Sequence, residues 1–279
     1  MNLHIINTGY FKLDGGAMFG VVPKSIWQRT NPSDENNMCS WAMRSLLIED
    51  EDRLALIDNG MGNKQSQKFF SYYYLHGNDS LLGSLHKRGF STGDITDMFL
   101  THLHFDHCGG GVQENDGKYN MTFENAEYWS NEAHWKWATQ PNAREKASFL
   151  KENIIPMQES GHLKFVDLQA DKPFDLFDLI VVNGHTDRQM LPKIRFKEHT
   201  IVFMADLLPS VGHIPLAYVM GYDTRPLITI QEKKEFLEEA ADNNYILFLE
   251  HDPINECCTV KHTEKGVRLD RVFPLSEIL

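Results

Sequence analysis

Short apolar runs recur along the chain, and their lengths predict strands buried in a sheet. Runs of four to eight apolar residues bounded by turn residues are typical of such strands, whereas helices are usually longer. The acidic cluster Asp50-Glu51-Asp52 predicts a hairpin turn between two of them. The predicted strands are 3–8, 41–49, 53–57, 98–101, 179–182, 201–205 and 245–250.

Helical spacing appears in three other parts of the chain. Residues 63–88 show it at both ends, around Gly77-Asn78, and residues 231–243 form an amphipathic pattern. Between 113 and 170 a polar, hairpin-like piece is followed by aromatic residues and a helical stretch from 141 to 159. We therefore predict a single domain over 1–279 with a helical insertion near 113–170.

Composition and charge point to small-molecule chemistry. The 279 residues are 42% hydrophobic, which is enough for a sizeable core. The formal charge of −12 disfavours binding to nucleic acids and to anionic membranes. Four cysteines without a C-x-x-C pair fit a reducing compartment, and no secretory signal or membrane-spanning stretch is visible. We expect a soluble, cytoplasmic protein.

The predicted strands share a feature at their carboxyl ends. Five of them are followed by side chains that bind metals or carry negative charge. Ligands of α/β proteins gather at that rim of a sheet. Each residue alone has an ordinary explanation, because aspartates often cap turns and histidines often form hydrogen bonds to the backbone. Such explanations would be needed five times over, so we favour a shared site. The residues are Asp58, the cluster 102–107, His185, Asp206 and His251.

The cluster after the strand 98–101 carries the strongest chemical signal. It reads His102-Leu-His104-Phe-Asp106-His107, followed by Cys108 and three glycines. If the strand continues, His102 and His104 lie on the same side, since side chains alternate. Imidazoles and a carboxylate at this spacing suit divalent transition metals, and two pairs suggest two ions. We interpret Cys108 as a packed residue rather than a ligand.

These motifs, taken in order, resemble those of the metallo-β-lactamase superfamily. The resemblance runs from Trp41 to His251. It implies an α/β fold, an αββα sandwich of two mixed sheets flanked by helices. It also implies a metal-dependent hydrolase with two divalent ions, most often Zn²⁺, although Fe, Mn and Co suit such sites as well.

The resemblance assigns a role to each motif residue. The first ion would be held by His102, His104 and His185, and the second by Asp106, His107 and His251. Asp206 would bridge the two ions. Asp58 would orient a ligand histidine through a hydrogen bond.

Further segments resemble a group of quorum-quenching N-acyl-homoserine lactonases. These are 14–20 with Pro23, Lys24 and Trp27, then 206–209, 213–215 and Tyr222-Asp223. One departure concerns the turn after Gly184-His185-Thr186, where the family usually has Pro-Gly-His and this chain has Asp187-Arg188-Gln189. The ligand is retained, but the altered turn changes the expected pocket.

The function expected from these patterns is hydrolysis of a small-molecule ester, with a lactone of the acyl-homoserine type first. A hydroxide shared by two ions would attack the carbonyl. Asp106 or a metal-bound water would protonate the leaving group, and Tyr222 would either donate to the developing oxyanion or simply pack at the edge of a strand. Met18, Phe19 and the tryptophan-rich segments would either accommodate an acyl chain or belong to the core, whereas His213 is expected to be structural.

Three rival functions use similar motifs. Organophosphate triesterases differ mainly in pocket shape. Phosphodiesterases that process RNA are disfavoured by the acidic charge. Flavodiiron reductases are disfavoured because no Glu stands at position 104 and the chain lacks a flavin domain. The resemblance also implies a homodimer formed through the N-terminal loop region.

Overall fold

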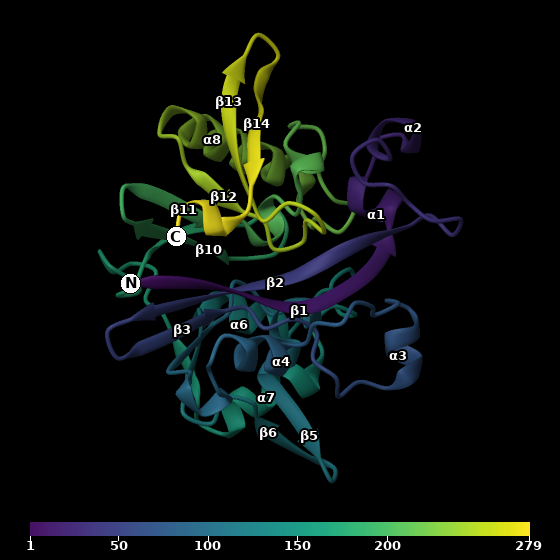
Figure 1. Ribbon diagram of the computed structural model, residues 1–279. Coiled ribbons are helices and arrows are strands. Elements are labelled where there is room, and N and C mark those ends of the chain that lie inside the picture. Colours follow the sequence, from purple (N-terminus) through teal and green to yellow (C-terminus); the bar gives the residue numbers. More distant parts are fainter. The chain divides into compact units, whose positions relative to one another are not determined.

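The computed structural model covers residues 1–279 and divides into two compact units. Unit 1 comprises 1–9 and 43–176, and unit 2 comprises 10–42 and 177–279. The division falls within two long strands, β1 (Asn2–Asp14) and β2 (Met38–Asp50). Each unit is built on a six-stranded sheet with helices beside it (Figure 1). This confirms the predicted fold class of two mixed sheets flanked by helices.

The sheet of unit 1 has the strand order β1-β2-β3-β4-β7-β8. β2 and β3 form the predicted antiparallel hairpin, and β3, β4, β7 and β8 are parallel neighbours. The mixed sheet thus places the carboxyl ends of β3 and β4 side by side. The remaining strands are β3 (Arg53–Ile57), β4 (Asp97–Phe99), β7 (Glu127–Ser130) and β8 (Leu163–Phe165).

Five helices and a small hairpin complete unit 1. The hairpin strands β5 (Val112–Asn115) and β6 (Lys118–Met121) pair with each other and lie beside the last helix, as Figure 1 shows. The helices are α3 (Gln67–Ser71), α4 (Leu81–Lys87), α5 (Phe105–Cys108), α6 (Glu132–Thr139) and α7 (Lys151–Glu159). Short 3-10 turns span Thr92–Asp94 and Gly109–Gly111.

The sheet of unit 2 has the order β14-β13-β12-β11-β10-β9. Only β11 and β12 are parallel, and α8 (Pro226–Asp242) lies between them in the chain. α8 packs against β13 and β14 (Figure 1). The strands are β9 (Asp178–Val182), β10 (Gln189–Phe196), β11 (His199–Phe203), β12 (Ile246–Phe248), β13 (Cys257–Thr263) and β14 (Gly266–Phe273).

Unit 2 also contains short helical segments near its loops. These are α1 (Gly15–Phe19), α2 (Lys24–Trp27) and the 3-10 turns Ala205–Leu207, Val211–His213 and Leu275–Glu277. None of the helices in the structure is long and apolar enough to cross a membrane.

The central strands are buried on both faces, which explains their continuous apolar sequence. Ala55, Leu56 and Ile57 of β3 are all fully buried, as are Ile246 to Phe248 of β12. Side chains of a strand alternate between faces, so such a run is stable only when both faces are covered. In unit 2 the rings of Phe203 and Phe248 stack at 5.3 Å between neighbouring strands.

The segment 113–170 differs from the predicted helical insertion. It contains α6 and α7, but β7 and β8 extend the main sheet of unit 1. Helix α7 begins only at Lys151, so residues 141–150 are loop. Oδ1 of Asn142 accepts the backbone N–H groups of Arg144 and Glu145 as an N-cap does, and the Lys146 N–H donates to the Asn142 carbonyl at 3.0 Å, so a single helix-like turn forms there but does not continue to α7.

The strand before the histidine cluster is shorter than predicted. β4 ends at Phe99, so His102 and His104 follow the strand rather than belong to it. Their arrangement therefore depends on local contacts and not on strand alternation.

Candidate metal centre

In unit 1, a buried aspartate at the end of β3 organises the segment after β4. Oδ1 of Asp58 accepts the backbone N–H of Thr101 at 2.9 Å, and Oδ2 accepts the Thr101 hydroxyl at 2.7 Å. Oδ2 also lies 3.0 Å from Nδ1 of His107. An ionised carboxylate only accepts hydrogen bonds, so His107 carries its proton on Nδ1 and keeps a lone pair on Nε2. Asp58 thus has the orienting position predicted from the sequence.

The same chain of contacts sets the ring of His102. The Thr101 hydroxyl gives its proton to Asp58, so it must accept from Nδ1 of His102, which lies 3.1 Å away. The lone pair of His102 is then on Nε2, and this atom lies 3.1 Å from Nδ1 of His104. Two ring nitrogens directed at one point are a suitable pair of donors for a divalent ion.

Asp106 and His107 lie on α5, one turn further on. Nε2 of His107 and Oδ2 of Asp106 are 3.9 Å apart. Both residues are buried, at 0% and 9% exposure. The structure therefore brings together all five residues that the sequence predicted within this unit.

The glycines after the cluster allow one loop to pack directly on another. A Cβ on Gly109 would meet the carbonyl of Met61, and one on Gly110 would meet the carbonyl of Asn59. Gly110 N–H donates to the Gly60 carbonyl at 3.0 Å, and Asn59 N–H donates to the His107 carbonyl at 2.8 Å. These contacts hold α5 against the end of β3.

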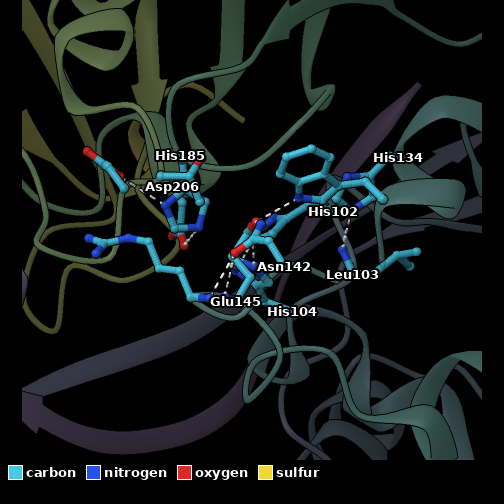
Figure 2. A network of polar contacts seen from close by, with 12 residues as sticks. His102, Leu103, His104, His134, Asn142, Glu145, His185 and Asp206 are labelled. Carbon is cyan, nitrogen blue, oxygen red and sulfur yellow. Dashed lines mark hydrogen bonds and ion pairs between the residues drawn. The ribbon is translucent and has the colours of Figure 1, made fainter. Parts of the chain in front are cut away.

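Sequence reasoning missed two buried residues that support the cluster. His134 of α6 accepts the backbone N–H of Leu103 at Nε2, at 2.9 Å (Figure 2). Glu145 places Oε1 3.4 Å from Nε2 of His104. His134 stands 27 residues and Glu145 38 residues after His107, without recognisable ligand spacing, so no sequence signal marks them.

In unit 2, the carboxylate of Asp206 lies between two histidines. Its Oδ2 is 3.0 Å from Nε2 of His185, and its Oδ1 is 3.0 Å from Nε2 of His251. The other ring nitrogen of each histidine contacts an acceptor of the protein. Nδ1 of His185 lies 3.0 Å from Asp223 Oδ1, and Nδ1 of His251 lies 2.8 Å from the Ala42 carbonyl. All three predicted residues of this unit are thus brought together.

The electrostatics of this group favour a cation. Burial opposes a charge on His185, yet the carboxylates of Asp206 and Asp223 outweigh it and raise the pKa of His185 to about 10. The position between Nε2 of His185 and Asp206 therefore attracts positive charge. A divalent ion can take the place of a proton there, because both atoms are good ligands for it.

The turn that departs from the family pattern is held by the two residues just before α8. Arg225 donates to Asp187 at 2.9 Å and to the Asn183 carbonyl at 2.6 Å. The N–H of Thr224 donates to the His185 carbonyl at 3.0 Å. Asp187 therefore stabilises the turn that carries the ligand.

Two other predicted residues have different surroundings. Tyr222 is 39% exposed and directly precedes Asp223, so it lies on the loop that holds His185. His213 is buried in the core of unit 2, where its ring stacks on Phe19 at 4.3 Å. Its Nε2 lies 2.9 Å from the Met18 carbonyl. This contact agrees with the expected structural role of His213.

The segment proposed as an acyl-chain wall is core instead. Met18 and Phe19 are 2% and 0% exposed, and Phe19 also stacks on Trp27 at 5.4 Å. Within unit 2 these side chains are therefore unavailable to a substrate.

Both donor groups fit divalent metal ions. Their nitrogens and carboxylate oxygens are the ligands that zinc, iron, manganese and cobalt share. The burial of these groups would be costly without a compensating charge.

Comparisons with known proteins agree with the geometry. Residues 44–251 match the sequence model of the metallo-beta-lactamase superfamily. No curated protein matches the chain.

Three solved structures illustrate the similarity. A probable metal-dependent hydrolase from Staphylococcus aureus is 27% identical, with 98% of this chain and 96% of that chain covered and a TM-score of 0.87. AidC, a dizinc quorum-quenching lactonase in complex with the product N-hexanoyl-L-homoserine, is 24% identical, with coverages of 98% and 95% and a TM-score of 0.77. An N-acyl homoserine lactone hydrolase with the same product bound at its catalytic metal centre is 18% identical, with coverages of 90% and 93% and a TM-score of 0.68.

Proposed function

This chain belongs to the metallo-beta-lactamase superfamily of metal-dependent hydrolases, and we propose that it hydrolyses small-molecule lactones of the acyl-homoserine type with two divalent ions. The observation that carries the proposal is the carboxylate of Asp206. Each of its oxygens lies 3.0 Å from a different histidine, as expected of a ligand shared by two ions. Zinc is the proposed metal.

The proposed ligand set is the one implied by the resemblance. Unit 1 supplies His102, His104, Asp106 and His107, and unit 2 supplies His185, Asp206 and His251. In support, His102, His107, His185 and His251 each have one nitrogen held by the protein and the other directed at a donor neighbour. This arrangement is general for metal-binding histidines.

When bound, two such ions lower the pKa of a water molecule and polarise the substrate carbonyl. The residues of the chain supply the remaining steps. Asp106 is proposed to accept the proton that the attacking water loses and to pass it to the alkoxide that leaves when the ring opens. Tyr222 is proposed to donate its hydroxyl hydrogen to the oxygen that gains negative charge. Its 39% exposure leaves it accessible to a substrate.

A cavity of unit 1 is the proposed site of the acyl chain. It has a volume of about 640 Å³ and is lined by the end of α6, the loop 140–150 and α7, where the apolar side chains of Phe149, Ile154 and Ile155 stand beside polar ones such as Lys146. The ring of Phe149 also packs on His104 at 4.7 Å. An apolar chain in this cavity would therefore begin beside a proposed ligand. The similarity to solved lactonases also supports this substrate class.

The test is a hydrolysis panel for the zinc-loaded protein. It contains homoserine lactones with short and long acyl chains, aryl esters, a phosphotriester, bis-nitrophenyl phosphate and a cephalosporin. We expect lactone turnover that depends on chain length and that a chelator abolishes. Turnover of the phosphorus esters alone would contradict the proposed lactone substrate and would favour the organophosphate triesterase alternative.

One variant tests the cavity within the same panel. Ile155→Trp should raise KM for long-chain lactones and leave short-chain lactones unaffected, because the larger ring fills the cavity. Gln158→Trp on the same helix is the control, since Gln158 is exposed and does not line the cavity. Equal effects on KM for short-chain and long-chain lactones would mean that the acyl chain does not bind in this cavity.

A further inference from the structure

Glu145 is a buried carboxylate in the loop between α6 and α7, and no motif accounts for it. Its exposure is only 2%. One carboxylate oxygen, Oε2, accepts the indole N–H of Trp137 at 2.7 Å and the amide of Asn142 at 2.6 Å. These two donors fix the orientation of the carboxylate, so its other oxygen points in a defined direction. Burying such a group is expensive unless its charge is used.

The second oxygen, Oε1, faces His104. It lies 3.4 Å from Nε2 of that ring, as Figure 2 shows. On the opposite side of the ring, Nδ1 lies 3.1 Å from Nε2 of His102. Glu145 and the donor atom of His102 thus lie against different nitrogens of the same imidazole. A proton held on the Glu145 side leaves the Nδ1 lone pair for an ion.

The loop that carries Glu145 is also tied to α5. The Ser148 N–H donates to the Glu145 carbonyl at 2.8 Å, and the Phe105 N–H donates to the Ser148 carbonyl at 3.0 Å. Phe149 packs on the face of His104. The loop therefore holds both the backbone next to His104 and its ring.

We propose that Glu145 is a positioning residue that holds His104 with Nδ1 directed at the metal, by accepting the proton on Nε2. This inference rests on the proposed metal site. Asp58 and Asp223 lie 3.0 Å from the Nδ1 atoms of His107 and His185, and Glu145 lies at the longer distance of 3.4 Å from Nε2 of His104. Carboxylates that hold a ligand histidine in this way sharpen its orientation and strengthen its binding to metal.

The test compares Glu145→Gln with wild type by two measurements that do not depend on activity. Zinc affinity is measured by competition with a chromophoric chelator, and the visible absorption bands of the cobalt-loaded protein report ligand geometry. We expect zinc binding to weaken by about 10- to 100-fold and the cobalt bands to shift. Glu132→Gln, at an exposed position of α6, is the matched control and should change neither.

The outcomes separate this inference from the proposed function. A folded Glu145→Gln with zinc affinity within twofold of wild type and unchanged cobalt bands would overturn the positioning role alone. If the wild-type protein bound no zinc, both the proposed function and the positioning role of Glu145 would be wrong. If Glu145→Gln does not fold, Trp137→Phe removes a single anchor, and an unchanged affinity there overturns the role. A smaller but clear loss in Trp137→Phe supports it.

Discussion

At the scale of residues, the site depends on what holds each histidine as much as on the histidines themselves. Asp58 contacts both Thr101 and His107, and through Thr101 it sets the proton position of His102. One carboxylate therefore determines which nitrogen is available in two rings. Its backbone has a φ of 54°, in the left-handed region that aspartate and asparagine tolerate better than most residues.

This suggests a substitution that changes the chemistry and keeps the backbone. Asp58→Asn fits the same left-handed conformation, but an amide nitrogen cannot accept the proton of His107 or Thr101. We expect zinc affinity to fall by about 10- to 100-fold, measured by chelator competition. Asp52→Asn in the exposed hairpin turn is the control. Unchanged zinc affinity in Asp58→Asn would show that Asp58 does not orient the ligands.

A second prediction concerns the buried ring of His213. Burial lowers the pKa of His213 to about 3, against about 6.5 in an unfolded chain. Between these values the unfolded state binds more protons, so the free energy of unfolding falls as the pH falls, by up to about 1.4 kcal/mol per pH unit. The His213→Gln variant lacks this contribution. The difference between its free energy of unfolding and that of the wild type should therefore become smaller from pH 7 to pH 5.

Urea unfolding of both proteins at pH 7, 6 and 5 measures the effect. Groups that titrate in both proteins cancel in the difference. A difference that stays constant over this range would mean that His213 binds its proton equally well in the folded and the unfolded protein, and that burial does not keep its ring neutral.

The sequence was a good guide to the ligands and a poor one to their supports. H-x-H-x-D-H is recognisable because its donors are adjacent in the chain. Asp58, His185, Asp206 and His251 are recognisable because they follow apolar runs. Glu145 lies in a loop and His134 on a helix, and only the packing of those segments brings them to the histidines. No spacing could mark them.

At the scale of elements, β3, β11 and β12 were predicted well because burial gives them continuous apolar sequence, whereas β10, β13 and β14 were not predicted. The loop 141–150 was predicted as helix, but the single turn that begins at Asn142 does not continue. The end of β4 was also misplaced. The apolar run continues to Leu100, but sheet pairing stops at Phe99, where the backbone turns to bond with Asp58.

Helix α8 contains a buried lysine that ties it to a loop of unit 2. Nζ of Lys233 donates to the carbonyls of His213, Pro215 and Tyr218 at 2.8, 3.0 and 2.8 Å. Lys233→Met should lower the free energy of unfolding by about 3 kcal/mol, because three carbonyls lose a donor. The neighbouring Lys234 is exposed, so Lys234→Met should change it by less than about 0.5 kcal/mol.

Denaturant unfolding of the two variants provides the comparison. Equal stability of Lys233→Met and Lys234→Met would mean that the loop 213–218 is held by other contacts and that the lysine is not a tether.

At the scale of the whole molecule, the chain has the fold and the motifs of a hydrolase family whose metal ligands are drawn from well-separated parts of the sequence. Four of the proposed ligands belong to unit 1 and three to unit 2. The resemblance implies this set from the order of the motifs, each of which follows a strand. The substrate depends on the shape of loops such as 141–150, and that shape could not be read from the sequence.

The measurement that tests the account most directly is the number of zinc ions bound per chain. We predict two ions for wild type by native mass spectrometry and elemental analysis, and fewer for Asp206→Asn, which loses the carboxylate that both His185 and His251 face. Asp242→Asn, at the exposed end of α8, should retain two. One ion or none in the wild-type protein, or two firmly bound ions in Asp206→Asn, would contradict a binuclear centre built on Asp206.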